Sequence, residues 1–190
     1  PALRLAVWAH VAGDSPPHVV TRELVELADV FAVTATHTAE LPAFAVPPTV
    51  IPAAPDPKRL AGAERRAHDG FTVGYIGTLD FAKLHPRFAE LCASVGVPGA
   101  RFIVCGAGEA ASQLDGRIEL RGYVEEIGPV LAELDVFGYP LAPGNYATSD
   151  LALQEAMAAG VPAVVLDHGA PSDLVEHGVT GLVARDEAEY

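Results

Sequence analysis

Apolar and polar positions occur in blocks along the chain, and the spacing within each block predicts a strand or a helix. Short, mostly apolar runs are typical of strands covered on both faces, and apolar positions at helical spacing fill the segments between them. Strands are predicted at 3–9, 30–33, 71–76, 101–105, 117–120, 136–139, 163–166 and 180–184, and helices at 18–27, 34–41, 85–94, 125–133, 151–159 and 171–176. Because strands alternate with helices, the pattern predicts an α/β fold with a doubly wound parallel sheet.

The most informative segment runs from Pro140 to Gly169. A loop rich in Gly, Pro and Asn leads to Thr148-Ser149-Asp150, residue types that favour the start of a helix. A mostly apolar helix follows, which Gly160 ends. Glu155 is the acid inside this helix, and its neighbours are small and apolar, so we expect it to face a cleft. A free helix N-terminus beside an inward carboxylate predicts a site for an anion that carries a hydroxylated group.

Composition changes near Ala53, where we place a domain boundary. Residues 54–70 are predicted to be a linker, because prolines and the charged run Glu64-Arg65-Arg66 are typical of exposed segments. Residues 1–53 contain too few strand–helix units for a complete domain of this class. We therefore expect the chain to be a fragment, or its numbering to start inside a longer protein. Residues 71–190 are predicted to form the main parallel sheet.

Half of the residues are hydrophobic, which is enough to build a core, and the formal net charge is -13. This charge opposes binding to a phosphate backbone, so no nucleic-acid partner is expected. Cys92 and Cys105 lie in apolar contexts and are expected to be buried free thiols, as in a reducing cytosol. No apolar run approaches the roughly 20 residues of a membrane span, and no signal peptide is recognised. We expect a cytoplasmic protein.

Several motifs in the second half resemble a known enzyme family. The run Q-E-A-M-A-A-G-V-P-A-V-V, followed by H-G-A-P-S-D-L-V-E-H-G-V-T-G-L-V, resembles the donor-binding core of glycosyltransferase family 4. Its members are retaining enzymes of the GT-B fold, in which two Rossmann-like domains face each other across a cleft. The resemblance implies that residues 1–53 are the end of the N-terminal domain. It implies that residues 71–190 are the nucleotide-sugar-binding domain, truncated at its C-terminus.

The resemblance also implies roles for individual residues. Glu155 would accept hydrogen bonds from the nucleotide ribose, and the backbone N–H groups of Ser149, Asp150 and Leu151 would hold the diphosphate. Lys83, in the motif G-T-L-D-F-A-K, would stabilise the leaving diphosphate. Further donor-binding residues implied by the resemblance are Gly77, Thr78, Gly106, Gly108, Tyr123 and Val124. From the residues alone, a structural acid at Glu155 and a surface charge at Lys83 remain open.

Two positions depart from the family pattern. Thr78 stands where the family has an arginine, so Lys83 is expected to act alone or with help from Arg87 or His85. Ala147 stands where the family has the first of two glutamates eight positions apart, the one that reaches the donor sugar. Polar residues near this position are Asn145, Tyr146 and Thr148. His10 ends an N-terminal strand, where some family members place a histidine that faces the donor sugar; an ordinary loop histidine is the alternative.

The leading hypothesis is a retaining glycosyltransferase, or its donor-binding domain, that transfers a sugar from a nucleotide diphosphate sugar to an acceptor hydroxyl. No metal or further cofactor is expected, because the histidines show no metal-ligand spacing. The acceptor is a glycan, a lipid-linked molecule or a small molecule, and peripheral contact with the inner face of the membrane is implied by the family. A catalytically impaired partner subunit is the second hypothesis. A NAD-dependent oxidoreductase, based on the G-x-G-x-x-A pattern at 106–111, is the third.

Overall fold

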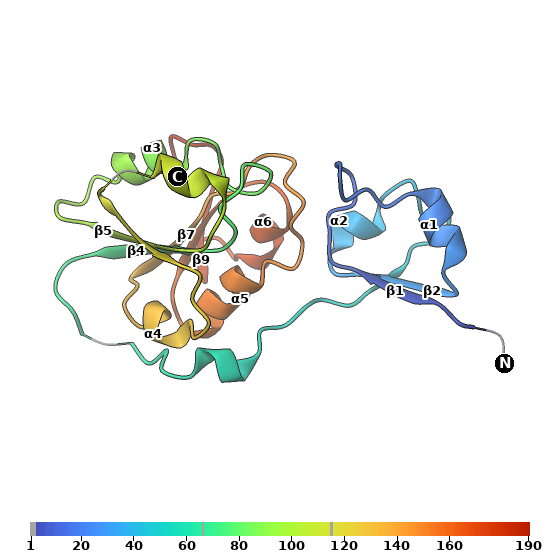
Figure 1. The fold of residues 1–190 in the computed structure, drawn as a ribbon, viewed down its shortest axis with the longest axis horizontal. Coiled ribbons are helices and arrows are strands. Elements are labelled where there is room, and N and C mark those ends of the chain that lie inside the picture. Colours follow the sequence, from blue (N-terminus) through green and yellow to red (C-terminus); the bar gives the residue numbers. More distant parts are fainter. Residues whose placement is uncertain (1–2, 66, 115) are drawn as a thin grey trace.

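The computed structural model describes residues 3–65, 67–114 and 116–190, and these residues form two separate parallel sheets (Figure 1). The smaller sheet has the strand order β1-β2-β3, and the larger has the order β6-β5-β4-β7-β8-β9. The predicted fold class, an α/β protein with a parallel sheet preceded by a smaller part, is therefore confirmed.

The smaller sheet is built from the N-terminal part of the chain. Its strands are β1 (Ala6–Ala9), β2 (Val30–Val33) and β3 (Thr49–Val50), and its helices are α1 (Arg22–Leu27) and α2 (Thr36–Ala39). Strand β2 lies between the other two and pairs with both in parallel. Helix α1 begins after Thr21, whose hydroxyl accepts a hydrogen bond from the Leu24 N–H at 3.3 Å, and this bond caps the helix.

The larger sheet lies in the second part of the chain. Its strands are β4 (Thr72–Ile76), β5 (Arg101–Cys105), β6 (Ile118–Gly122), β7 (Val136–Tyr139), β8 (Ala163–Leu166) and β9 (Gly181–Ala184), and all of its pairings are parallel. Strands β4 and β7 are hydrogen-bonded neighbours. From this pair the chain runs outward in opposite directions, through β5 to β6 and through β8 to β9. At such a reversal point, a parallel sheet leaves a crevice for ligands outside the carboxyl ends of its strands.

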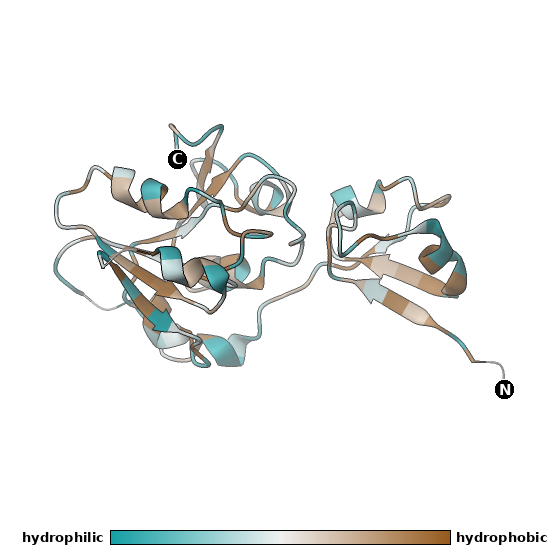
Figure 2. Ribbon diagram, turned by 45° about the horizontal axis from the view of Figure 1, so that its top comes forward, coloured by the Kyte–Doolittle hydropathy of each residue, from teal (hydrophilic) through white to brown (hydrophobic). Residues whose placement is uncertain are grey.

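Helices cover both faces of the larger sheet. They are α3 (Phe88–Ser94), α4 (Gly128–Leu131), α5 (Leu151–Ala158) and α6 (Ala170–Leu174), with the 3-10 helices η1 (Pro57–Leu60) and η2 (Glu109–Gln113). In Figure 1, α3 lies on one face, and α4 and α5 lie on the other. The strands are the more hydrophobic elements (Figure 2). The core between the sheet and its helices includes Tyr75, Leu131, Phe137, Tyr139 and Leu153, each at most 1% exposed. Burying one such side chain stabilises the fold by roughly 1.5–3 kcal/mol.

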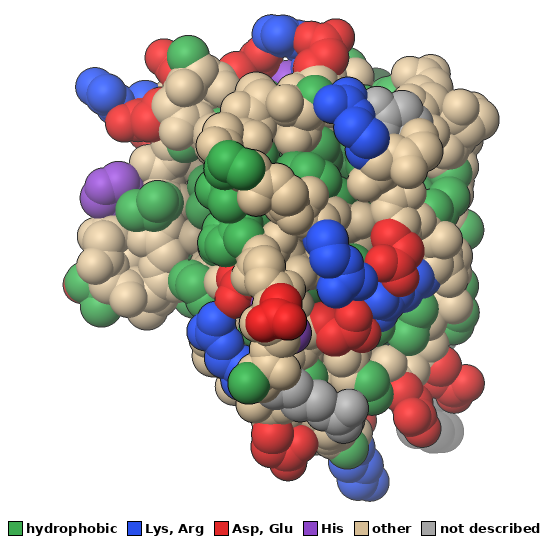
Figure 3. All heavy atoms as spheres, turned by 90° about the vertical axis from the view of Figure 1, so that its left-hand side faces the viewer, with side chains coloured by type: hydrophobic (Ala, Val, Ile, Leu, Met, Phe, Trp, Pro, Cys, Tyr) green, Lys and Arg blue, Asp and Glu red, His purple; other side chains and the backbone are tan. Residues whose placement is uncertain are grey.

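The β6 edge of this sheet carries paired charges. Arg121 donates to both carboxylate oxygens of Glu133, at 2.8 and 2.9 Å, and pairs with Glu119 as well. Arg101 also contacts Glu119, at 3.0 Å. Figure 3, a view onto the left-hand side of Figure 1, shows acidic and basic side chains next to one another. Charges on this face therefore largely neutralise one another.

Among the described residues, none of the helices is long and apolar enough to cross a bilayer.

Strand bounds follow the sequence closely, whereas helices are shorter than predicted. Strands β2, β5, β7 and β8 have the predicted bounds, but α1, α3 and α4 all begin later than expected. The helix predicted at 85–94 begins only at Phe88, so Pro86 precedes it. The cause is pairing with a distant segment: Leu84 bridges to Leu141, and the His85 N–H donates to the Pro140 carbonyl at 3.0 Å. These contacts keep the backbone out of the helix until Phe88.

The segment between the two sheets contains a short helix. Helix η1 is capped by Asp56, whose Oδ1 accepts a hydrogen bond from the Lys58 N–H at 2.9 Å. In the charged run predicted to be exposed, Arg65 is exposed but pairs with Asp135, the residue before β7. Arg66, in the same run, lies outside the described residues. The connecting segment is therefore attached to the larger sheet.

The loops after β4 and β5 approach so closely that Gly106 has no room for a side chain. A Cβ atom there would lie 1.9 Å from the carbonyl oxygen of Gly77. We expect Gly106→Ala to lower the free energy of unfolding by about 3 kcal/mol, because the backbone must shift to admit the methyl group. Gly96→Ala is the matched control, since a Cβ at Gly96 meets nothing within 4 Å. Urea unfolding measures both variants, and equal stability would contradict the close approach.

Candidate functional site

A pocket of about 330 Å³ opens at the carboxyl ends of β4, β5 and β6, beside α5. Most of the residues that the sequence predicts for the donor site line it: Gly77, Thr78, Gly106, Tyr123, Val124, Leu151 and Glu155. The other lining residues are Arg59, Ile76, Cys105, Ala107 and Ala152. Segments far apart in the sequence thus converge at the reversal point of the sheet, where folds of this class bind ligands.

Backbone hydrogen bonds hold the pocket loops together. The Gly77 N–H donates to the Cys105 carbonyl at 2.9 Å, and the Gly106 N–H donates to the Gly122 carbonyl at 2.7 Å. These bonds connect the loops after β4, β5 and β6 in one series. A ligand in the pocket therefore meets a floor of backbone, which glycines allow it to approach closely.

Glu155 is the buried acid of the pocket. Its side chain is 4% exposed, and its Oε1 lies 3.3 Å from Nε of Arg59. Burial raises the pKa of Glu155 above its ordinary value, Arg59 lowers this pKa, and Asp56 raises it. The predicted inward orientation of Glu155 agrees with this arrangement, but sequence reasoning missed Arg59, which it placed in a linker. The only sequence signal was the Asp-Pro start of η1, and it carries no functional meaning by itself.

The start of α5 lies at the mouth of the pocket, and Leu151 lines it. Because the helix begins at Leu151, the N–H groups of its first turn have no acceptor within the helix. Ser149 lies two residues before Leu151. The Ser149 hydroxyl is 3.0 Å from Nδ1 of His10, and the Ser149 carbonyl accepts a hydrogen bond from the Gln154 side chain at 2.6 Å. His10, for which a donor-facing role and an ordinary loop position were both left open, thus contacts the residue before the N-cap Asp150.

Asp150 has an unusual conformation for a helix N-cap. Its backbone is left-handed, with φ 40° and ψ 45°, and its side chain does not cap the helix. The carboxylate is instead buried: Oδ1 accepts a hydrogen bond from the Tyr139 hydroxyl at 3.0 Å, and Oδ2 has no hydrogen-bond partner among the described residues. The sequence predicted this position as part of the helix start but not the inward carboxylate.

Lys83 lies in the same buried group. Its Nζ is 5.4 Å from the ring centroid of Tyr139, in cation–π geometry. Burial lowers the pKa of Lys83, while the nearby carboxylates of Asp150 and Asp80 raise it. Asp80 also accepts a hydrogen bond from the Tyr146 hydroxyl at 3.2 Å. The lysine predicted to face a diphosphate is therefore already subject to the negative charges of two carboxylates.

The N-terminal part contacts the loop that leads into α5. The hydroxyls of Thr34 and Thr148 are 2.7 Å apart, and the Ala12 N–H donates to the Tyr146 carbonyl at 2.9 Å. The Ser15 hydroxyl donates to the carbonyl of Gly144 at 3.2 Å. Of the polar residues expected near Ala147, Thr148 and Tyr146 therefore take part in these contacts. Asn145 bonds within its own loop, to the Ala142 carbonyl and the Ala147 N–H.

Other predicted residues do not line the pocket. Gly108 contacts the neighbouring loop, where a Cβ would lie 2.2 Å from the Leu79 carbonyl oxygen. Arg87 and His85, the expected helpers of Lys83, both pair with Glu187 instead. The G-x-G-x-x-A pattern leads into the 3-10 helix η2, whereas a dinucleotide fingerprint requires an α-helix there. This pattern therefore does not form a dinucleotide site.

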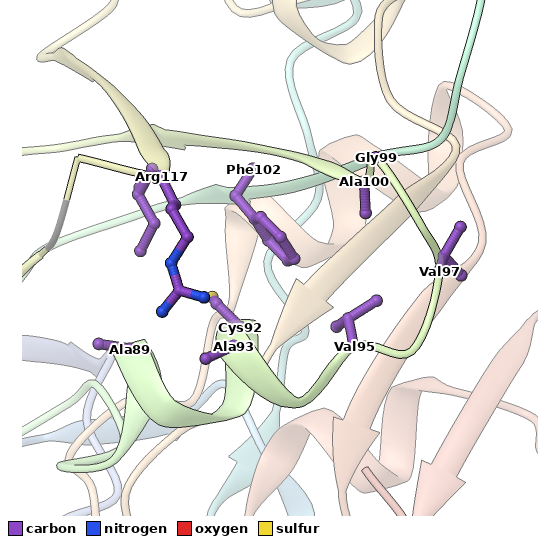
Figure 4. Close-up of a pocket in the computed structure, with 10 residues that line it drawn as sticks. Ala89, Cys92, Ala93, Val95, Val97, Gly99, Ala100, Phe102 and Arg117 are labelled. Carbon is purple, nitrogen blue, oxygen red and sulfur yellow. The ribbon is translucent and has the colours of Figure 1, made fainter.

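A second pocket, of about 290 Å³, lies at the opposite end of the strands (Figure 4). It is formed by the end of α3 and the starts of β5 and β6, and its lining includes Val95, Phe102 and Arg117. Figure 4 shows the Arg117 side chain pointing toward Cys92. None of the residues predicted for the donor site belongs to its lining, so the pocket beside α5 is the candidate site.

Asp150 gives this buried group a testable pH dependence. Burial raises the pKa of its carboxyl, so the folded chain binds this proton more readily than the unfolded chain. The free energy of unfolding of the wild type, relative to Asp150→Asn, should therefore rise as the pH falls through this raised pKa toward 3.8, the ordinary value. Urea unfolding at about pH 7.5 and about pH 4.5 measures this difference. The exposed Asp173→Asn is the control, and a relative stability that falls toward acid would contradict the burial.

Similarities to known proteins agree with this geometry. The chain is 31% identical over 116 residues to a GDP-mannose-dependent alpha-mannosyltransferase of Mycobacterium tuberculosis, an alignment covering 58% of the chain and 29% of that protein. It is 34% identical over 118 residues to a protein of the same description from Mycolicibacterium smegmatis, again covering 58% and 29%. The chain thus spans less than a third of the length of these relatives.

A solved structure matches nearly the whole chain. Anabaena HepE, in complex with UDP and glucose, aligns with a TM-score of 0.76 at 19% identity, covering 98% of this chain and 59% of that one. Both sheets therefore have counterparts in part of a GT-B enzyme. A family model described as "Glycosyl transferases group 1" matches residues 70–190, which include every residue that lines the pocket except Arg59. The chain therefore belongs to the group 1 glycosyl transferases, and the resemblance to glycosyltransferase family 4 is confirmed.

Proposed function

We propose that this chain is the donor-binding part of a retaining glycosyltransferase that transfers a hexose from a nucleotide diphosphate sugar to an acceptor hydroxyl. The pocket beside α5 is the observation that carries the proposal. It combines a buried carboxylate, a helix N-terminus and a glycine-rich floor at the reversal point of a parallel sheet. Each of these features suits one part of a nucleotide diphosphate.

The ribose is assigned to Glu155. A buried carboxylate is costly unless it is paired or hydrogen-bonded, and a ribose diol supplies two hydroxyl donors. Tyr123 lies at the rim with 80% of its surface exposed, and an exposed aromatic ring suits stacking against a base. Val124 lies next to it in the pocket wall. The base is therefore assigned to the loop after β6.

The diphosphate is assigned to the start of α5. The unpaired amides of the first turn and the helix dipole favour an anion there. Lys83 supplies positive charge, partly offset by Asp80 and Asp150. As the glycosidic bond breaks, these groups stabilise the leaving diphosphate, and a diphosphate oxygen takes the proton of the acceptor hydroxyl on the same face of the sugar. This route needs no general base from the chain.

The relatives suggest the class of donor. The mycobacterial relatives named above are described as GDP-mannose-dependent, and HepE was solved with UDP and glucose. We therefore propose a GDP-hexose or UDP-hexose donor. The acceptor is proposed to be the hydroxyl of a glycan, a lipid-linked molecule or a small molecule, reached by a cytoplasmic enzyme in peripheral contact with the membrane.

A catalytically impaired partner subunit is the alternative function. Thr78 brings no charge to the pocket at the position where an arginine was expected, and Ala147 brings no acid. Incubating the full-length protein with GDP-mannose or UDP-glucose and a panel of acceptors separates the two functions. Sugar transfer with retention at the anomeric carbon, seen by proton NMR, supports the enzyme. Nucleotide binding without transfer supports the partner subunit.

Removing the carboxylate should weaken nucleotide binding. We expect Glu155→Gln to lower the affinity for UDP or GDP about tenfold to a hundredfold, because charged hydrogen bonds to the ribose are lost. Isothermal titration calorimetry measures this change. Glu64→Gln, at an exposed position, removes the same charge and should bind as the wild type does. Equal affinity of Glu155→Gln and the wild type would refute the ribose assignment.

The role of Lys83 predicts a dependence on the number of phosphates. We expect Lys83→Met to weaken binding of the nucleoside diphosphate about tenfold, and to change binding of the nucleoside hardly at all. Calorimetry with uridine, UMP and UDP, or with the guanosine series, measures this gradient. A loss of the same size for all three ligands would show that the variant perturbs the pocket generally, and would contradict the assignment.

A further inference from the structure

The ion pair between Arg59 and Glu155 joins the connecting segment to the pocket. Arg59 lies in η1, with its side chain 44% exposed, and Glu155 lies in α5 with its side chain 4% exposed. Both residues line the pocket. Among the described Lys and Arg residues, Arg59 is the one that lines this cavity. The connecting segment therefore supplies the local cation in a chain whose net charge is -13.

Arg59 favours the ionised form of the Glu155 carboxylate. Burial disfavours its charge, and Asp56, the N-cap of η1, adds a second negative charge nearby. Arg59 acts in the opposite direction. The other side chains of the pocket wall that can ionise belong to Cys105 and Tyr123, and neither can carry a positive charge. Among the described residues of the pocket wall, Arg59 is therefore the cation that favours the charged form of Glu155.

The contact also leaves room for a ligand. Arg59 approaches Oε1 of Glu155 through Nε, and within the described residues no side chain pairs with Oε2. A carboxylate has about four acceptor sites, so Oε2 and part of Oε1 can accept hydroxyl donors. A guanidinium on one oxygen also restricts rotation of the carboxylate, which orients the other oxygen.

We propose that Arg59 is a positioning residue of the nucleotide pocket: it holds Oε1 of Glu155 so that Oε2 meets the ribose hydroxyls. This inference rests on the proposed function, because it takes Glu155 as the ribose-binding acid. It adds that affinity for the nucleotide depends on the connecting segment, which lies outside the part matched by the family model.

The first test needs no ligand. Carboxyl carbon NMR, with the Glu155 signal identified from Glu155→Gln, follows the titration of this residue in the wild type, Arg59→Gln and Lys58→Gln. Arg59→Gln should raise the pKa of Glu155, because the cation beside it is removed. Lys58→Gln removes a neighbouring exposed cation and should leave this titration unchanged. An unchanged titration in Arg59→Gln would overturn the inference.

The second test measures UDP and GDP binding by calorimetry at about pH 7.5 and about pH 5.5. Arg59→Gln should bind about tenfold more weakly than the wild type, and this loss should grow as the pH falls, because the Glu155 carboxylate is protonated more readily without the cation beside it. Arg59→Lys should recover part of the affinity, and Lys58→Gln should match the wild type. A merely structural role of Arg59 would not produce the added loss at low pH.

The outcomes separate the two claims. If the wild type binds the nucleotide and Arg59→Gln binds it with the same affinity, the positioning role is refuted and the proposed function is not. Tighter binding by Arg59→Gln also refutes it, because Arg59 would then compete with the ribose for Glu155. Failure of the wild type to bind either nucleotide refutes the proposed function, and the positioning role with it.

Discussion

The pairing of β4 with β7 determines where the rest of the larger sheet places its side chains. These strands are neighbours although β5 and β6 lie between them in the chain, and all are parallel. Their following loops therefore leave the same edge of the sheet and diverge to opposite sides. Helix α5 begins in the space between them, and Glu155 is carried into that space one turn later. The order of the strands therefore sets the position of the pocket, and the side chains set its chemistry.

Much of this arrangement could be predicted from the sequence, because buried parallel strands are short apolar runs with clear ends. The bounds of β5 and β8 followed directly from such runs. Glu155 stood out because it is an acid among small apolar residues. Helix starts were harder to predict, since α3 is delayed by pairing of Leu84 with Leu141, a contact between distant residues that no local pattern contains.

The residues that sequence reasoning missed are defined by tertiary contacts. Arg59 lies in a proline-rich segment with no hydrophobic period, and its position beside Glu155 appears only after the chain has folded. Asp150 has a residue type suited to an N-cap, yet its side chain turns inward to Tyr139. The cost of its left-handed backbone is about 1 kcal/mol, comparable with the gain from one hydrogen bond. Because this cost and this gain are of equal size, residue type alone does not predict whether Asp150 caps the helix or turns inward.

The loop before α5 belongs to the larger sheet by sequence, but it is bonded to the N-terminal part through Ala12, Thr34 and His10. These contacts are polar, and water can replace each of them at a net cost of roughly 1 kcal/mol per bond. A ring contact between His18 and Tyr146, with centroids 5.0 Å apart, joins the same two parts of the chain. The loop that leads into α5 is therefore shaped by residues from both parts of the chain, so a substitution in the N-terminal part that breaks these bonds also alters the entrance to that helix.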